Sequence, residues 1–191
     1  NSLNDAHDMA ETLKRKGFTV VELYDPSTKR VMLDSILKYF KLLQAQHDAA
    51  GLVFYSGHGM QVKGVNYLIP TLANPQIEAD LDDQCVNMDY VMRAIEQAEN
   101  RLNIFILDAC RNNPFSAKMQ RTIRTRAVSR GLAAVEPTGN VLIAFSAREG
   151  TTAADGSGRN SPFTSSLLRH LESPGLEINF LFRNVRDDVL K

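Results

Sequence analysis

Two residues of this chain, a histidine and a cysteine, are of the types that carry out nucleophilic catalysis. His58 lies in the run SGHG, and Cys110 lies farther along the chain in the run DAC. A thiol is a weak nucleophile until it loses its proton, at an unperturbed pKa of about 8.5. A nearby histidine can take that proton, or can stabilise the thiolate as an imidazolium. The pair therefore predicts acyl transfer, with Cys110 as the nucleophile and His58 as the acid–base group.

Taken one at a time, both residues have plainer explanations. A lone cysteine often packs as a small buried hydrophobe, and a lone histidine fits a turn at the end of a strand. Two apolar runs that each end in such a residue favour catalysis over both explanations. Gly57 and Gly59 flank the histidine and permit close approach of a substrate backbone. The N–H groups of Gly59 and Cys110 would form an oxyanion hole, at about 3 kcal/mol per donor.

The elements expected to position His58 and Cys110 are strands, which the sequence marks by continuous apolar runs. GLVFYS (51–56) precedes the histidine, NIFIL (103–107) precedes the cysteine, and VLIAFS (141–146) is a third run of the same kind. Such runs are typical of strands that are covered on both faces. Segments with helical periodicity separate or follow them: 4–16, 29–47, 88–99, 161–171 and 177–190. Strands that alternate with helices predict an α/β sheet, with the pair at its carboxyl edge.

Local pattern alone predicts three further features. FTVVELY (18–24) is rich in β-branched and aromatic residues, which predicts a strand. MQVKGVNYLIP (60–70) predicts a hairpin with a Lys-Gly turn. At the start of the first helix, Asn4 or Asp5 is expected to cap the exposed N–H groups.

The composition of the 191-residue chain narrows the function classes. Apolar residues make up 43% and charged residues 23%, the profile of one globular domain with a real core. Lys+Arg and Asp+Glu are both 22, so no net charge favours nucleic acid or an acidic membrane surface. No apolar run approaches the roughly 18 residues of a membrane span, and no secretory signal pattern opens the chain. We therefore expect a cytoplasmic location without membrane or nucleic-acid partners.

The two cysteines do not predict a structural role in cross-linking or zinc binding. They are too few for a disulfide framework, and neither has a partner at zinc-ligand spacing. Cys85 is expected to pack in the core.

Several short motifs, taken together and in order, resemble the caspase-like cysteine peptidases, in particular the bacterial metacaspase and paracaspase types. The motifs are YSGHG (55–59), NYLIP (66–70), ADLDD (79–83), DACRNNPF (108–115), RGL (130–132) and SPFTSSLL (161–168). The spacing of His58 and Cys110, roughly 50 residues, is also that of caspases. The cysteine motif departs from both patterns: caspases carry QACxG and metacaspases DxCHSG, where this chain has DACRNN.

The resemblance covers the whole chain and implies a single caspase-like peptidase domain over 1–191. It implies a three-layer α-β-α sandwich around a mostly parallel six-stranded sheet. The family's first strand is expected to be missing here, because the chain opens directly on a predicted helix. Substrates would be proteins or peptides, no cofactor would be required, and both a monomer and a homodimer stay open. Two alternatives remain: a catalytically silent caspase-like interaction module, and a different α/β hydrolase that uses Cys110 on a small molecule.

Acidic residues near the pair bear on substrate choice. Asp108 lies two positions before Cys110, so the two positions share one face of the strand. By resemblance to metacaspases and paracaspases, Asp108 lines a pocket for Arg or Lys, and Asp155 resembles a second pocket acid on the loop after the third strand. We therefore predict cleavage after arginine or lysine. The plainer explanation of Asp155 is a solvated loop residue.

A basic segment, 116–139, follows the cysteine strand and corresponds to the connection that caspases cut during maturation. We interpret it as a processing-type loop in which the enzyme cleaves itself, or else as a solvated linker. The candidate cleavage sites are Lys118, Arg121, Arg124, Arg126 and Arg130.

Clustered acids at 79–83 offer hard oxygen ligands of the kind that calcium prefers. Some metacaspases, by the same resemblance, bind an activating calcium ion near this position. Acids at the start of a helix are also frequent caps, because they favour its positive end. Both explanations apply to Asp80, Asp82 and Asp83.

Overall fold

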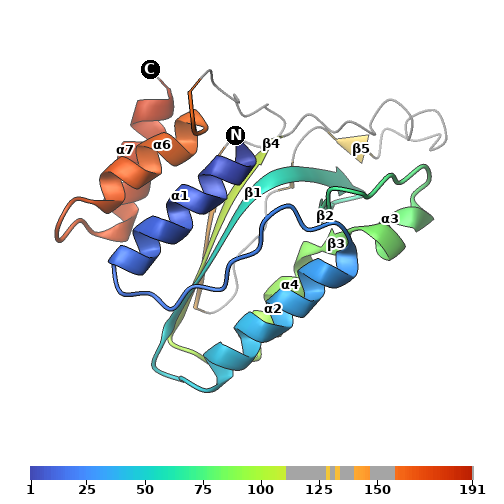
Figure 1. Ribbon diagram of the computed structural model, residues 1–191, viewed down its shortest axis with the longest axis horizontal. Coiled ribbons are helices and arrows are strands. Elements are labelled where there is room, and N and C mark those ends of the chain that lie inside the picture. Colours follow the sequence, from blue (N-terminus) through green and yellow to red (C-terminus); the bar gives the residue numbers. More distant parts are fainter. Residues whose placement is uncertain (111–127, 130–131, 134–139, 147–157, 191) are drawn as a thin grey trace.

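A computed structural model describes residues 1–110, 128–129, 132–133, 140–146 and 158–190, with the backbone alone at Cys110, Val128 and Ser129. Within these residues a mixed six-stranded sheet has the order β3-β2-β1-β4-β6, and β5 pairs with β1 (Figure 1). The strands are β1 (Ala50–Val62), β2 (Val65–Leu68), β3 (Val86–Asn87), β4 (Leu102–Cys110), β5 (Val128–Ser129) and β6 (Val141–Phe145). The helices are α1 (Ser2–Arg15), α2 (Lys29–Gln44), α3 (Ala79–Gln84), α4 (Met88–Glu96), α6 (Pro162–Leu171) and α7 (Ile178–Val189).

Parallel pairing joins three strands at the centre of the sheet. β1 pairs with β4 and β4 with β6 in parallel, whereas β2, β3 and β5 join by antiparallel pairing. The antiparallel part begins at a tight turn, where Lys63 and Gly64 adopt left-handed conformations with φ of 51° and 84°. The predicted α/β sheet and the predicted hairpin are confirmed, and the described sheet is mixed.

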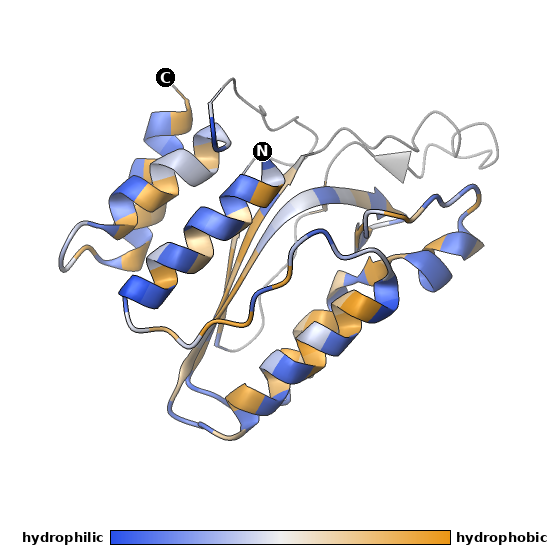
Figure 2. Cartoon of the chain, in the orientation of Figure 1, coloured by the Kyte–Doolittle hydropathy of each residue, from blue (hydrophilic) through white to orange (hydrophobic). Residues whose placement is uncertain are grey.

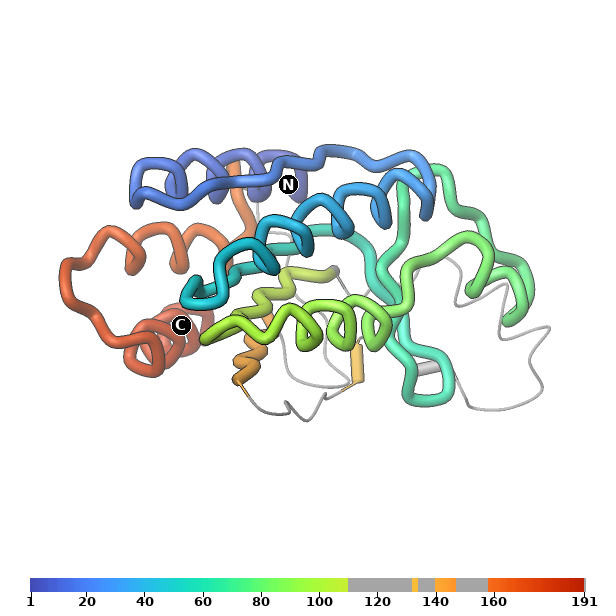
Figure 3. Tube along the Cα trace, turned by 90° about the horizontal axis from the view of Figure 1, so that it is seen from below, coloured from blue at the N-terminus to red at the C-terminus, as the bar shows by residue number. Residues whose placement is uncertain are grey.

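Helices cover the sheet on both faces, which makes three layers. α1, α6 and α7 cover one face, where Ile106 and Leu167 belong to one apolar cluster (Figures 1 and 3). α2 and α4 cover the other face, where Phe105 and Met92 belong to another. Hydrophobic residues run along the central strands in Figure 2, while the helices mix both kinds, as a doubly covered sheet and amphipathic helices require. No described helix combines the length and the apolar character needed to cross a membrane.

Cys85 packs in a third apolar cluster, as expected. It is fully buried beside Met60 and Leu81, at the end of the sheet where β2 meets α3. Burial raises the pKa of its thiol to about 11, so this cysteine stays protonated and unreactive at neutral pH.

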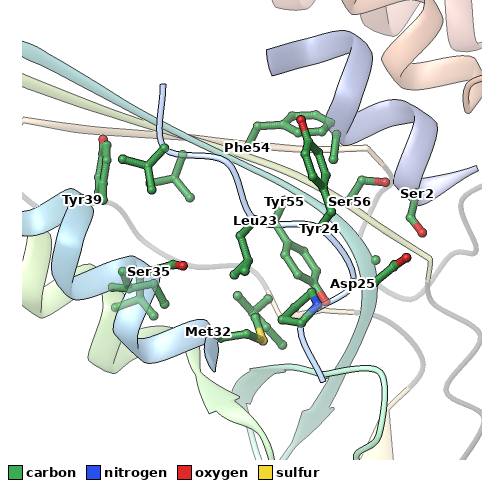
Figure 4. A pocket seen from close by; sticks show the side chains of 18 of the residues that line it. Ser2, Leu23, Tyr24, Asp25, Met32, Ser35, Tyr39, Phe54, Tyr55 and Ser56 are labelled. Carbon is green, nitrogen blue, oxygen red and sulfur yellow. The ribbon is translucent and has the colours of Figure 1, made fainter. Parts of the chain in front are cut away.

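Segment 18–24 was predicted as a strand, and this prediction is wrong, because the segment forms no strand in the structure. Along Ala50 to His58, the described strands pair with β1 only on the β4 side, since β2 joins from Gly59 onward. A cavity of about 340 Å³ lies along this edge, and its lining includes Leu23 of the segment and Tyr55 of β1 (Figure 4). A β-prone sequence forms no strand without a partner at hydrogen-bonding distance.

Candidate active site

His58 and Cys110 lie opposite each other at the carboxyl ends of two neighbouring strands. In the parallel register of β1 and β4, His58 pairs with Cys110, and Ser56 pairs with Asp108. Registered residues of adjacent strands are about 4.8 Å apart and belong to the same face, as do residues two apart on one strand. These four positions therefore lie on one face of the sheet, the face that α1 and α6 cover.

The backbone of His58 is held by two hydrogen bonds. Its carbonyl oxygen accepts from the Tyr55 hydroxyl at 2.7 Å and from the Ile69 N–H at 3.0 Å. The tyrosine lies directly against Gly57, where a Cβ atom would be 2.7 Å from the hydroxyl oxygen. Only glycine at this position leaves room for the tyrosine. His58 itself is exposed, which is compatible with the acid–base role predicted for it.

The N–H of Gly59 lies on the side of β1 that faces β4. Gly59 and Leu68 are registered partners, and the hydrogen bond from the Ile69 N–H to the His58 carbonyl identifies them as a pair without mutual hydrogen bonds. The N–H of such a residue faces away from β2, which here is toward the end of β4 at Cys110. In the parallel register this direction leads to the backbone of Cys110, and the role of the Gly59 N–H as an oxyanion donor stays a prediction.

Two buried carboxylates, those of Asp108 and Asp5, lie on the same face of the sheet, farther from its carboxyl edge than His58 and Cys110. Asp108 is 3% exposed and accepts hydrogen bonds from the hydroxyls of Ser161 and Thr164, the latter at 2.7 Å. Asp5, on α1, is 1% exposed and accepts from the Ser161 N–H at 3.0 Å and from the Ser56 hydroxyl at 3.1 Å. Ser161 thus bridges the two acids, because its N–H binds one and its hydroxyl binds the other.

The charge of this acid pair is not neutralised by any described side chain. Among the described residues, no lysine, arginine or histidine forms an ion pair with Asp5 or Asp108. Burial is the main cause that raises the pKa of Asp5, and the carboxylate of Asp108 adds to it, while the Ser161 N–H opposes it. The two shielded carboxylates thus have hydroxyl and N–H partners, and no cation among the described residues balances them.

Sequence reasoning missed Asp5 as a site residue and treated it as a helix cap. The helix begins earlier, at Ser2, with Asn1 in the capping position, so Asp5 lies inside the first turns. Its partners Ser56 and Ser161 are far away in sequence. An aspartate beside a helix start is an ordinary pattern, and no local signal distinguishes this one.

Several predicted site residues lie outside the described part of the chain. They are the second pocket acid, Asp155, and the candidate self-cleavage sites Lys118, Arg121, Arg124, Arg126 and Arg130. Their roles stay predictions.

The three acids proposed for calcium lie on α3, and two of them have other partners. The carboxylate of Asp80 accepts from the N–H groups of Gln76 and Ile77, which precede the helix, at 2.7 and 3.1 Å. The carboxylate of Asp82 accepts from the Tyr67 hydroxyl at 3.3 Å. In the described residues, no group of three or more acids, histidines or cysteines is placed to hold a metal ion, and Asp83 completes none. Calcium at this position stays a prediction.

The chain is similar to known proteins of one family. The caspase domain family matches residues 1–191. Mucosa-associated lymphoid tissue lymphoma translocation protein 1 of Homo sapiens is 29% identical over 110 residues, and its homolog of Mus musculus is equally similar. Each match covers 57% of this chain and 12% of the relative, so the matched part of the chain spans about an eighth of the length of these relatives.

Proposed function

The chain belongs to the caspase domain family, and from this membership we propose that it is a cysteine endopeptidase that cleaves proteins after arginine or lysine. The observation that carries the proposal is the acid pair, Asp5 and Asp108, on the same sheet face as His58 and Cys110. A guanidinium or ammonium group would bring the positive charge that the pair lacks. An aspartate side chain, which is the other specificity associated with caspases, would be repelled.

The reaction would proceed by acyl transfer. His58 takes the proton of the Cys110 thiol, and the thiolate attacks the carbonyl carbon of the peptide bond. The N–H groups of Gly59 and Cys110 donate to the oxyanion that develops. His58 then gives its proton to the leaving amine, which departs and leaves a thioester on Cys110. Water, activated by His58, hydrolyses the thioester and restores the free thiol.

The order of these residues along the sheet supports this reaction. Ser56 and Asp108 lie two positions before His58 and Cys110 on their strands, which is about 7 Å at the rise of a strand. An extended arginine side chain spans a distance of this order between its backbone and its charged end. A carbonyl at Cys110 is therefore compatible with a guanidinium at the acid pair.

Self-processing and a second pocket acid belong to the same proposal. A pocket that selects arginine or lysine would accept the basic residues of 116–139, which are Lys118, Arg121, Arg124, Arg126 and Arg130. Asp155 would add a third negative charge to the pocket. Calcium at Asp80, Asp82 and Asp83 would be regulatory, since no step of the reaction needs a metal.

A panel of fluorogenic peptides that end in Arg, Lys, Asp or Leu tests the proposal. We expect turnover of the Arg and Lys peptides by the unmodified chain and none by Cys110→Ala or His58→Ala. Turnover of the Asp peptide alone would contradict the acid-pair argument. Absence of turnover on every peptide would favour a silent interaction module.

A further inference from the structure

Three consecutive residues just before α6 are all tied to the first turns of α1. Arg159 donates to both carboxylate oxygens of Asp8, from Nε and from an Nη, each at 2.8 Å. The Asn160 side chain donates to Asp8 at 3.0 Å. The Asn4 side chain donates to the Arg159 carbonyl at 3.1 Å, and the Ser161 N–H donates to Asp5. Asn4, Asp5 and Asp8 lie on one side of α1, because residues three and four apart on a helix are neighbours.

The Asp8–Arg159 pair has the geometry that makes an ion pair strong. Two parallel N–H···O bonds join the planar guanidinium to both carboxylate oxygens, which fixes orientation as well as distance. Arg159 holds the pKa of Asp8 well below its usual range, so the pair stays charged throughout the neutral and mildly acidic range. The pair is at the rim, where Asp8 is 23% exposed and Arg159 61% exposed. It lies outside the acid pair and does not neutralise it.

What the pair fixes in place is Ser161, two residues after Arg159. The Ser161 hydroxyl accepts from the Thr164 N–H at 2.9 Å, which caps α6, and it donates to Asp108. Its N–H donates to Asp5. Both buried acids therefore depend on the position of one residue, and that position depends on how segment 159–161 is held against α1.

We propose that Asp8 and Arg159 are positioning residues for the substrate pocket: their ion pair holds segment 159–161 against α1 so that Ser161 keeps Asp5 and Asp108 together. This inference rests on the proposed function and adds two residues that touch neither the substrate nor the reacting atoms. The pair acts on binding of the basic side chain, because Ser161 organises the acids. It does not act on the thiol or the imidazole.

The kinetic test uses Asp8→Asn and Arg159→Gln, assayed on the Arg peptide. Each variant is expected to raise KM about fivefold, the effect of losing one well-oriented rim ion pair, with kcat within about twofold. The double variant is expected to be no worse than either single one, because both changes remove the same interaction. Arg159→Lys keeps the positive charge but cannot donate two parallel hydrogen bonds to one carboxylate. Its KM is expected to lie between those of the unmodified chain and Arg159→Gln.

Glu172→Gln is the matched control. Glu172 follows α6 and pairs with Arg15, the last residue of α1, and with Lys16 after it, at 3.0 and 3.3 Å, so it joins the two helices at their far ends. The control is expected to leave KM unchanged. An equal rise in KM with Glu172→Gln would overturn the proposal, because the effect would then reflect docking of α1 in general. Unchanged KM in both Asp8→Asn and Arg159→Gln, or a loss confined to kcat, would overturn it as well.

Amide hydrogen exchange separates this inference from the proposed function. The Ser161 N–H is bound to Asp5, so its exchange reports the position of the segment without any substrate. We expect faster exchange at 159–164 in Asp8→Asn and unchanged exchange in Glu172→Gln. Equal protection in Asp8→Asn and the unmodified chain would overturn the positioning role even if the chain cleaves after arginine. Failure to cleave any peptide would refute the proposed function and leave the exchange result to decide the positioning role.

Discussion

Replacing Asp5 by asparagine removes one charge from the acid pair and little else. The asparagine Oδ1 can still accept from the Ser161 N–H, and its amide nitrogen can donate to the Ser56 hydroxyl, which reverses one hydrogen bond. The side chain has the same shape, so the buried site is expected to keep its packing. The substitution is therefore a test of charge.

The loss in activity follows from the distance at which the charge acts. A guanidinium about 4 Å from a carboxylate gains about 4 kcal/mol at an effective dielectric constant of 20. Removing one partner of a buried charge pair costs about 2 kcal/mol or more. Because each 1.4 kcal/mol is a factor of ten, kcat/KM for the Arg peptide is expected to fall roughly 30- to 700-fold. Any residual turnover of the Leu peptide, which brings no charge, is expected to change by no more than a fewfold.

Stability is expected to move in the opposite direction from activity. The pKa of Asp5 is raised in the folded protein, chiefly by burial, so folding disfavours its ionised form. Ionised Asp5 thus costs stability at neutral pH. The cost disappears as the pH falls through the raised pKa and below the value of about 3.9 of an unfolded aspartate. Asp5→Asn should therefore melt about 2–4 °C higher at pH 7, if it gains about 1 kcal/mol, and no higher at pH 3.

Steady-state kinetics and thermal unfolding measure both effects on the same samples. Lower kcat/KM for the Arg peptide together with a higher melting temperature at pH 7 would support the charge argument. A variant that melts lower and loses the Arg and Leu activities equally would refute it, because Asp5 would then be a structural residue only.

Three further outcomes follow from contacts at the site. Tyr55→Phe removes the hydroxyl bond to the His58 carbonyl, at 2.7 Å, and is expected to lower kcat about fivefold with KM unchanged; equal kcat would mean that the hydroxyl does not position the histidine. Gly59→Ala would place a Cβ atom 2.9 Å from Leu132 Cδ2, so urea unfolding should show a free energy of unfolding that is lower by about 1–3 kcal/mol. Unaltered stability would mean that the Leu132 side chain moves aside without cost. On incubation, gel electrophoresis should show cleavage within 116–139 for the unmodified chain and an intact Cys110→Ala variant; equal intactness of both would dismiss self-processing.

The parts of the fold that the sequence predicts well depend on local pattern. The strands before His58 and Cys110 can be predicted without knowing their pairing partners, because a strand covered on both faces is apolar throughout its length. The Lys63-Gly64 turn is likewise a two-residue signal, since its backbone conformation selects glycine. These elements place His58 and Cys110 at one edge of the sheet.

What the sequence did not predict depends on contacts between distant segments. Segment 18–24 has the composition of a strand, yet the edge it would have to join lies across a cavity. Asp5 is a candidate site residue because of its hydrogen bonds with Ser56 and Ser161, and the sequence of its own helix does not reveal them. In the sequence Arg159 is an ordinary loop arginine, and only the structure shows its two hydrogen bonds to Asp8. In each case a partner far along the chain decides the role.

Covalent labelling of Cys110 tests the central claim most directly. A peptide that ends in an arginyl chloromethyl ketone carries both the positive charge for the acid pair and an electrophile for the thiol. Intact-mass and peptide mass spectrometry are expected to show one label per chain, on Cys110, formed much more slowly in His58→Ala and with the aspartyl analogue. Labelling at Cys85 instead, or equal rates for the arginyl and aspartyl reagents, would contradict the proposed endopeptidase and its basic specificity.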